Sequence, residues 1–199
     1  MSLSRASRAA LLTAVTAAGG LVLSACGGGN DSASKGTSNF VTDTGGISTV
    51  EAGQRRDTGK LAGETLDGKQ LDVADLKGKI VVMNVWGSWC PPCRAEAPHF
   101  VKVSNELKPK GVEFVGINTR DQNKGPAIAF EKDYGVEYPS LYDPAGKLIV
   151  NGFPKGTLAP QAIPSTVVLD REGKIAARSL MALNEEQLRK MIDPLIAEK

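Results

Sequence analysis

Two cysteines at the start of a predicted helix are the residues best placed for chemistry. Cys90 and Cys93 flank two prolines and directly follow an apolar run over residues 80–85. A cysteine at a helix N-terminus faces unpaired backbone N–H groups and the positive end of the helix dipole, which favour thiolate over thiol. Because only two residues separate the cysteines, the second sulfur lies within reach of the first. A disulfide can therefore form and reopen there, and we predict redox exchange.

Three other interpretations of the C-x-x-C pattern are open. A structural zinc site needs four ligands, whereas Cys90, Cys93 and His99 are the ligands that the sequence offers. An inert structural disulfide across this short loop is a second alternative, and a chance occurrence of the pattern is a third. The position between a buried strand and a helix favours redox exchange over all three.

The elements that must position this pair follow from the hydrophobic pattern. Buried strands are predicted at 80–85 and 112–118, and a hairpin is predicted around the Asp67-Gly68 turn. A second hairpin follows near the C-terminus. The predicted segments are a helix at 91–107 disturbed at Pro98, a helix at 126–134, strands at 166–170 and 174–179, and a last helix capped by Asn184 with apolar Leu188, Met191, Ile192 and Leu195. Strand–helix–strand units followed by an antiparallel pair predict an α/β fold with a mixed sheet and helices on both faces.

The composition is that of one soluble globular domain with tails. The chain has 199 residues, 41% hydrophobic and 23% charged, and a net charge of +2. A net charge this small makes a nucleic-acid partner an unfavoured interpretation, because nucleic-acid-binding domains usually carry a concentrated basic patch. Three cysteines are too few for a disulfide-stapled scaffold.

The first 25 residues differ from the rest. They combine two arginines, no acid and an apolar run that is too short to span a bilayer. This leader ends in Leu23-Ser24-Ala25-Cys26, which resembles the cleavage box of bacterial lipoproteins. The resemblance implies that Cys26 becomes the first residue of the mature chain and carries a lipid on the extracytoplasmic face of the cell membrane. Ordinary signal cleavage after Ala25 and an uncleaved anchor are the alternatives.

A change of composition also marks the domain boundary. Residues 26–58 contain the acylated cysteine and a segment rich in Gly, Ser, Thr, Asn and Asp, which predicts a flexible tether. Residues 59–199 remain for one folded domain, expected to be a monomer. Without the leader, the mature chain carries 22 basic and 22 acidic residues.

Three stretches of the domain resemble a known family. WCPPC after VVMNVWGSW, then RAEAPHF, and later AIPSTVVLD look like the TlpA/ResA branch of the thioredoxin fold, over roughly residues 59–199. The resemblance implies an extracytoplasmic thiol–disulfide oxidoreductase that is often membrane-anchored. It also implies a thioredoxin-like fold with an N-terminal β-hairpin extension. The reaction needs no organic cofactor, and we predict no metal site.

The resemblance assigns a role to Glu96. Thioredoxins carry a buried Asp where this chain has Asn84, and the branch instead has a Glu three residues after the second cysteine. The spacing of Glu96 with Phe100, Val103 and Leu107 independently places the carboxylate at one end of an apolar stripe. A desolvated carboxylate beside the cysteines would have a raised pKa and could relay the proton of the resolving thiol. The alternative is a solvent-facing Glu that stabilises the helix N-terminus.

The same resemblance predicts a substrate-binding surface around the cysteines. In the fold a cis-proline faces the pair, which implies a cis bond between Ile163 and Pro164. Trp86 is expected to pack in the core, and His99 to be a surface or packing residue. Trp89 is expected at an apolar rim, with core packing as its alternative. The predicted substrate-binding residues are Trp89, Pro91, Pro92, Ile163 and Pro164.

The predicted reaction is the reduction of protein disulfides. An exposed Cys90 attacks the substrate disulfide, and Cys93 then resolves the mixed disulfide and leaves the pair oxidised. Electrons would come from a membrane thiol carrier, because the outer face lacks cytosolic reductants. The family implies apocytochrome c, with its C-x-x-C-H site, as a candidate substrate. A general disulfide oxidase or isomerase, a metal-handling lipoprotein and a pure binding module are the alternatives.

Overall fold

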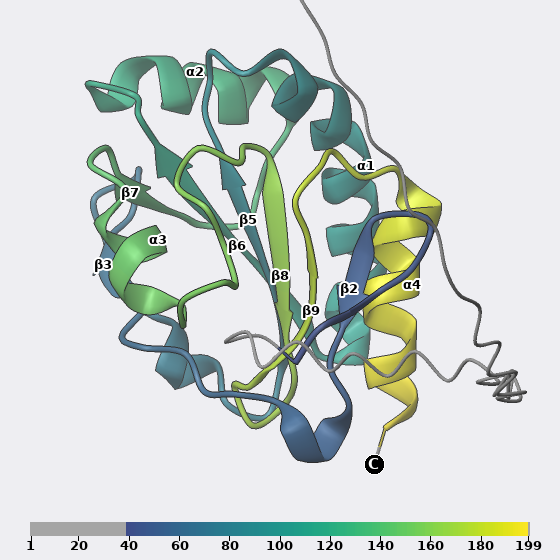
Figure 1. Ribbon diagram of the computed structural model, residues 1–199. Coiled ribbons are helices and arrows are strands. Elements are labelled where there is room, and N and C mark those ends of the chain that lie inside the picture. The colour runs from purple at the N-terminus through teal and green to yellow at the C-terminus, as the bar shows by residue number, and fades with distance from the viewer. Residues whose placement is uncertain (1–38, 199) are drawn as a thin grey trace, which may run out of the picture. The chain divides into compact units, whose positions relative to one another are not determined.

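A seven-stranded mixed sheet forms the centre of the computed structural model, which describes residues 39–198 (Figure 1). The strand order is β1-β2-β9-β8-β5-β6-β7, and β3 and β4 form a separate two-stranded sheet. The strands are β1 (Val41–Thr42), β2 (Ile47–Thr49), β3 (Ala62–Glu64), β4 (Gln70–Asp72), β5 (Ile80–Trp86), β6 (Val112–Thr119), β7 (Ser140–Asp143), β8 (Ser165–Leu169) and β9 (Ile175–Ser179). The helices are α1 (Pro91–Leu107), α2 (Lys124–Tyr134), α3 (Lys147–Gly152) and α4 (Glu185–Ala197).

Strand β5 is the central strand that leads into the cysteine pair. All seven of its residues are buried, and it pairs parallel with β6 and antiparallel with β8. Its continuous apolar sequence reflects this burial on both faces. The mixed sheet and the β3–β4 hairpin predicted from the sequence are confirmed.

Helices α1 and α4 cover one face of the sheet (Figure 1). Their apolar stripes meet Ile80 and Val82 of β5 in one core cluster. The predicted stripe of α4 is confirmed as buried, and its N-terminus carries a capping box between Asn184 and Gln187. Each of these two side chains accepts a backbone N–H at the helix start, which satisfies donors that the first turn leaves free. Helix α1 runs without a break through Pro98.

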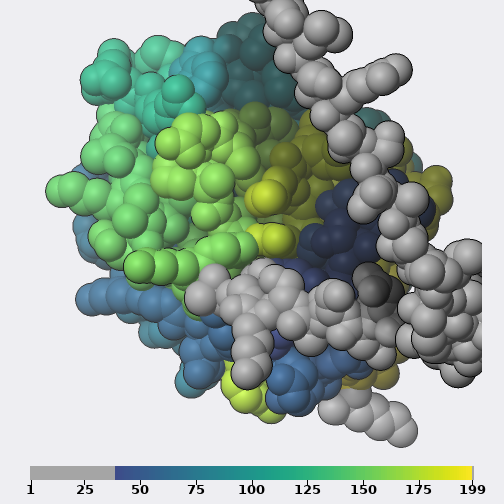
Figure 2. All heavy atoms as spheres, viewed as in Figure 1, coloured from purple at the N-terminus to yellow at the C-terminus, as the bar shows by residue number. Residues whose placement is uncertain are grey.

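The opposite face of the sheet is covered by α3 and by the segment that leads from α3 to β8. Figure 2 shows this face, where that segment (green to lime) lies over the strands of Figure 1. Met83 and Val85 of β5 point to this side and pack with Ile149 and Phe153. The two alternating sets of β5 side chains thus belong to two separate core clusters, as the period of a strand requires.

The folded part of the chain begins earlier than the sequence suggests. Strand β2 pairs antiparallel with β9, and Arg55 forms ion pairs with Asp170 and Glu198. The flexible tether predicted over residues 26–58 therefore does not extend through residues 41–58. The composition of this stretch is polar, but its pairing partner β9 lies far along the chain and cannot be recognised from the local pattern. Cys26 and the leader lie outside the described residues.

Three other elements differ from the predictions. Helix α2 begins at Lys124, because the Asn123 side chain caps it by accepting the N–H of Gly125, two residues ahead of the expected proline start. Strand β7 and helix α3 are too short to give a clear local pattern. Strand β7 is specified by its parallel pairing with β6, which is a contact between segments distant in sequence.

Candidate active site

The loop between β5 and α1 is a tight turn that ends at the first cysteine. The N–H of Cys90 donates to the carbonyl of Gly87 at 3.1 Å. A Cβ on Gly87 would lie 2.7 Å from Nε1 of Trp89, so a side chain at this position would require the indole ring to move. Cys90 is the N-cap of α1, and its Sγ accepts the N–H of Cys93 at 3.3 Å. The helix N-terminus thus faces the sulfur, as predicted.

Cys90 and Cys93 are joined by a disulfide, with their Cα atoms 5.3 Å apart. The expectation of an exposed Cys90 is wrong for this oxidised state, because Cys90 is 2% and Cys93 1% exposed. The reason is that both cysteines pack into an apolar cluster below the turn. That cluster also contains Leu66, Trp86, Ala97, Ala127 and Phe130, with Ile163 at its border.

The two tryptophans beside the motif have different environments. Trp86 is buried and stacks on Phe130 of α2, with ring centroids 4.4 Å apart, so its predicted core position is confirmed. Trp89 is 45% exposed, and the guanidinium of Arg120 lies over its ring at 4.8 Å. Pro91 and Pro92 are exposed as well. The surface around the disulfide is therefore an apolar rim, with one cation stacked on it.

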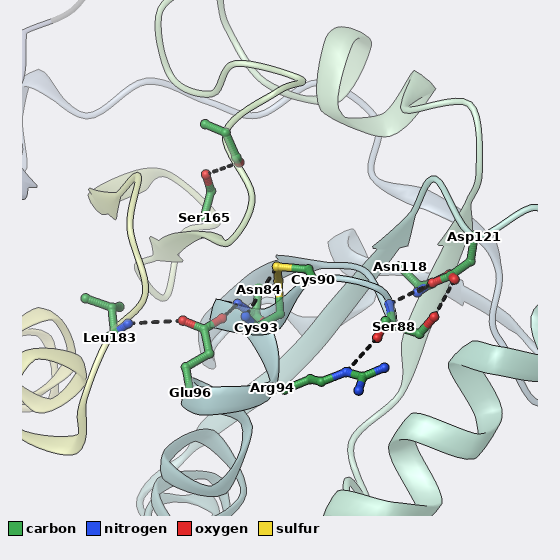
Figure 3. The surroundings of a disulfide bond; sticks show 11 residues. Asn84, Ser88, Cys90, Cys93, Arg94, Glu96, Asn118, Asp121, Ser165 and Leu183 are labelled. Carbon is green, nitrogen blue, oxygen red and sulfur yellow. Dashed lines mark hydrogen bonds between the residues drawn. A yellow bond between two sulfur atoms is a disulfide. The ribbon is translucent and has the colours of Figure 1, made fainter.

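Glu96 lies behind the disulfide and is almost fully buried, with 2% of the residue exposed. One carboxylate oxygen accepts Nδ2 of Asn84 at 2.8 Å, and the other accepts the N–H of Leu183 at 3.1 Å (Figure 3). Burial raises the pKa of Glu96 to about 7, and the two hydrogen bonds only partly oppose this rise. Glu96 and Cys93 are three residues apart on α1, so their side chains share one face of the helix. The alternative of a solvent-facing Glu is wrong.

The Ile163–Pro164 peptide bond is cis, as predicted from the resemblance. Ile163 borders the apolar cluster that holds the cysteines. Ser165 opens β8 opposite Val85, and its hydroxyl donates to the carbonyl of Ala162 at 2.5 Å, which closes the loop on itself. The cis peptide bond and the Cys90–Cys93 disulfide thus lie at the same edge of the sheet.

A second buried carboxylate lies at this edge, that of Asp121, which was not among the site residues predicted from the sequence. It accepts the N–H and the hydroxyl of Ser88 and the side-chain amide of Asn118. A general rule could have found it. Parallel strands end at the same edge of a sheet, so residues that follow β5 and β6 meet there.

Three further observations concern the wider site. His99 is half-buried on α1. Within residues 39–198, no group of three or more His, Cys, Asp or Glu side chains is placed to hold a metal ion. Over the same range, none of the helices is both long and apolar enough to cross a bilayer.

These features make one kind of chemistry available. A dithiol that closes reversibly to a disulfide exchanges two electrons with another disulfide, and one of its sulfurs sits at a helix N-terminus. Exchange also requires that the second thiol lose a proton. Since the pKa of Glu96 is about 7, this side chain can accept a proton near neutral pH.

Comparisons with known proteins agree with this chemistry. Residues 51–192 match the family model described as Redoxin. The chain is 32% identical over 123 residues to a thiol-disulfide oxidoreductase ResA of Bacillus cereus, which covers 62% of this chain and 67% of that protein. It is 38% identical over 126 residues to the thiol:disulfide interchange protein HelX of Rhodobacter capsulatus, covering 62% of the chain and 65% of HelX.

A solved structure shows the same fold. A secreted thiol-disulfide isomerase from Corynebacterium glutamicum superposes with a TM-score of 0.73 and 30% identity, over 81% of this chain and 99% of that one. The resemblance inferred from the sequence motifs is thereby confirmed. With its thioredoxin-like fold and its Cys90–Cys93 disulfide, the chain belongs to the Redoxin family and is a thiol–disulfide oxidoreductase.

Proposed function

We propose that the protein works as a reductase of protein disulfides outside the cytoplasm. In its reduced form, the Cys90 thiolate attacks a substrate disulfide, forms a mixed disulfide and releases one substrate thiolate, which takes up a proton. Cys93 then loses its proton to Glu96 and attacks Cys90, which releases the second substrate thiolate. The substrate gains two electrons, and the Cys90–Cys93 disulfide re-forms. A membrane dithiol carrier returns the two electrons.

The observation that carries this proposal is the environment of the disulfide. A dithiol is a strong oxidant when its fold stabilises the reduced thiolate. Here two influences act against the helix N-terminus, which by itself favours the Cys90 thiolate: both cysteines are buried, and the carboxyl of Glu96 lies behind them. Within residues 39–198, the Cys93 N–H is the one hydrogen-bond donor to Cys90 Sγ, at 3.3 Å, so hydrogen bonding gives the thiolate little further stabilisation. Burial and nearby negative charge both disfavour the thiolate, which makes the couple more reducing.

The substrate that we propose is a protein with an extended disulfide segment, with apocytochrome c as the first candidate. The exposed ring of Trp89 and the adjacent prolines of the motif provide an apolar rim for such a segment. The cis Ile163–Pro164 bond lies at the same edge of the sheet. We assign substrate binding to this surface, and we expect the enzyme to act as a monomer.

The equilibrium potential of the Cys90/Cys93 couple tests the direction of the reaction. We expect a value below about −200 mV at neutral pH, measured against glutathione or dithiothreitol. The physical reason is the weakly stabilised thiolate of the buried pair. A potential near about −120 mV would instead identify a disulfide oxidant.

An isomerase is the second candidate function. The C. glutamicum neighbour is described as a secreted thiol-disulfide isomerase and shares the fold over most of both chains. An isomerase attacks a wrongly paired disulfide, and a thiol of the substrate then displaces the enzyme from the mixed disulfide. No net electron transfer takes place. Recovery of activity by a scrambled substrate protein, without added reductant, would favour this candidate over the reductase.

We also propose that Cys26 carries a lipid that holds the enzyme on the outer face of the membrane. The leader composition and the Leu23–Cys26 box support this placement. A diacylglycerol thioether with one further acyl chain supplies enough buried methylenes for stable anchoring.

Replacing Cys26 with alanine tests the anchor. The wild-type protein is expected in the detergent phase of a Triton X-114 partition, and Cys26→Ala in the aqueous phase or the medium. The purified wild type and variant should have equal disulfide reductase activity, since Cys26 is more than 60 residues before the Cys90–Cys93 pair in the sequence. Equal partition of the two proteins would count against lipidation.

A further inference from the structure

The turn that precedes Cys90 is held by a buried carboxylate from the neighbouring strand end. Asp121 is 5% exposed, and its Oδ2 accepts the backbone N–H of Ser88 at 2.9 Å. Its Oδ1 accepts the hydroxyl of Ser88 at 2.5 Å. Asn118, near the end of β6, donates its side-chain amide to Oδ2 at 2.7 Å (Figure 3). Three donors thus meet one carboxylate, and hydrogen bonds to a charged acceptor are the strong ones.

Ser88 is also held from its other side. Its carbonyl accepts Nε of Arg94, a residue of the first turns of α1, at 2.9 Å. The N–H, the hydroxyl and the carbonyl of Ser88 are therefore all engaged. Because Ser88 lies two residues before Cys90, these bonds determine where the helix N-terminus and its sulfur lie.

The segment that carries Asp121 is itself unusual. Arg120 has a φ of +64° and is the one non-glycine residue with a positive φ in the described part of the chain. Its guanidinium lies over the ring of Trp89, and the Tyr142 hydroxyl donates to the carbonyl of Asp121 at 3.0 Å. Such a backbone conformation persists where the surrounding contacts over-determine it. Here Asp121 contacts Ser88 and Arg120 contacts Trp89, the two central residues of the turn, and Tyr142 of β7 holds the carbonyl of Asp121.

We propose that Asp121 is a positioning residue of the reaction, which fixes the Cys90 turn through Ser88 and whose negative charge disfavours the Cys90 thiolate. The first part of this inference concerns geometry and is independent of the direction of the reaction. The second part deepens the proposed reductase function and rests on it. Figure 3 shows the arrangement, with the disulfide between Glu96 on one side and Ser88 with Asp121 on the other.

Other charged or titratable groups lie on the elements packed around Asp121, and they stay constant in the test. From α1 come Arg94 and Glu96, and from the segment after β6 comes Arg120. From β7 and α2 come Tyr142 and Lys124, whose ammonium lies over the Tyr142 ring at 5.5 Å. The cations partly offset the carboxylates. A change at Asp121 alone therefore reports on its own charge.

Replacing Asp121 with asparagine separates charge from geometry. The asparagine oxygen can accept Ser88 N–H and the Asn118 amide, and its new NH₂ group can donate to the Ser88 hydroxyl, which accepts as well as donates. The variant thus keeps the three bonds and loses the negative charge. Asp121→Ala loses both.

We expect Asp121→Asn to stabilise the reduced form of the pair. Its equilibrium constant with glutathione should shift about threefold to tenfold toward the dithiol, which corresponds to a potential about 15 to 30 mV more positive. The pH midpoint of Cys90 alkylation by iodoacetamide should move lower in the same variant. In Asp121→Ala, the rate of disulfide reduction should be at least ~10-fold below that of Asp121→Asn, because a displaced nucleophile reacts slowly.

The matched control is Asp170→Asn. Asp170 accepts the backbone N–H groups of Glu172 and Lys174 in the β8–β9 turn, at the opposite end of the sheet from the disulfide. The Asp170→Asn substitution should leave the potential of the Cys90/Cys93 couple and the pH profile of Cys90 alkylation unchanged. Should Asp121→Ala not fold, Ser88→Ala removes one bond to the same carboxylate, and its reduction rate should still fall below that of the wild type.

The outcomes distinguish the two parts. A potential of Asp121→Asn equal to that of the wild type overturns the charge effect. Equal reduction rates of Asp121→Ala and Asp121→Asn, or a wild-type rate in Ser88→Ala, overturn the positioning role. The wild-type potential could prove to be that of an oxidant, with the potential of Asp121→Asn more positive still. That result would overturn the proposed reductase function and would support the role of Asp121.

Discussion

Replacing Cys93 with serine is expected to stop turnover and to leave the enzyme covalently attached to its substrate. Cys90 still attacks a disulfide, but the neighbouring thiol that would release the product is gone. An intramolecular thiol acts at a very high effective concentration, so its loss should slow resolution by a factor of at least ~10³. The rate of insulin reduction with dithiothreitol as electron donor measures this loss. Non-reducing electrophoresis of alkylated extracts detects the trapped complexes, and mass spectrometry identifies the substrate.

Cys90→Ser is the matched control for the trapping experiment. It should be equally inactive but should trap no partner, because the first attack requires the sulfur at the N-cap of α1. Complexes that form as readily on Cys90→Ser as on Cys93→Ser would reverse the assigned order of the two cysteines. Apocytochrome c among the trapped proteins would support the proposed substrate, and its absence would count against it.

Replacing Glu96 with glutamine is expected to remove the base that accepts the Cys93 proton. General base catalysis contributes about 10²-fold or more, so the resolving step should slow by about 100-fold near neutral pH. At high pH the difference should become small, because Cys93 then loses its proton to solvent. Stopped-flow tryptophan fluorescence, reported by Trp86 and Trp89 beside the disulfide, measures the step as a function of pH.

The stability of the oxidised protein gives a second measurement on Glu96. Burial raises its pKa from 4.5 in the unfolded chain to about 7 in the folded one. The stability linked to this group is therefore fully present below pH 4.5 and is lost as the pH rises through about 7. The free energy of unfolding of the wild type, relative to Glu96→Gln, should fall by up to ~3 kcal/mol between about pH 4 and about pH 8. Urea unfolding curves at several pH values measure it.

Glu106→Gln is the control for both measurements. Glu106 is exposed near the other end of the same helix, where it pairs with Arg189, so its substitution changes the charge of α1 without touching the buried carboxylate. A surface ion pair of this kind contributes little to stability. The pH profile of the resolving step and the pH dependence of unfolding above about pH 5 should therefore match those of the wild type. A wild-type pH profile in Glu96→Gln would refute the proton relay.

Much of the architecture could be predicted from local patterns. The run over 80–85 is apolar on both faces of its strand apart from Asn84, which is typical of a central buried strand. The last helix shows its cap and its buried stripe within one short stretch of sequence. The helix after the cysteines begins where the two prolines permit a first turn. In each case, the signal lies within a single segment.

Elements whose pairing partners lie far away in the sequence could not be predicted from local patterns. Strand β2 is short and lies in a polar stretch, and its pairing with β9 brings it into the sheet. Strand β7 likewise depends on β6. The expected exposure of Cys90 was wrong because the residues that cover it, Trp86 and Phe130, meet through the packing of α2 on the sheet.

By itself the sequence determined the reactive pair, its place at a helix N-terminus and the family, because these depend on residue types and short spacings. Only the tertiary structure decided the environment of the pair. The oxygens of Glu96 meet Asn84 on β5 and the N–H of Leu183 before α4, while Asp121 reaches Ser88 from the end of another strand. Burial and charge act through space, so the proton affinity of Glu96 and the hold on the Cys90 turn arise when distant segments come together at one edge of the sheet.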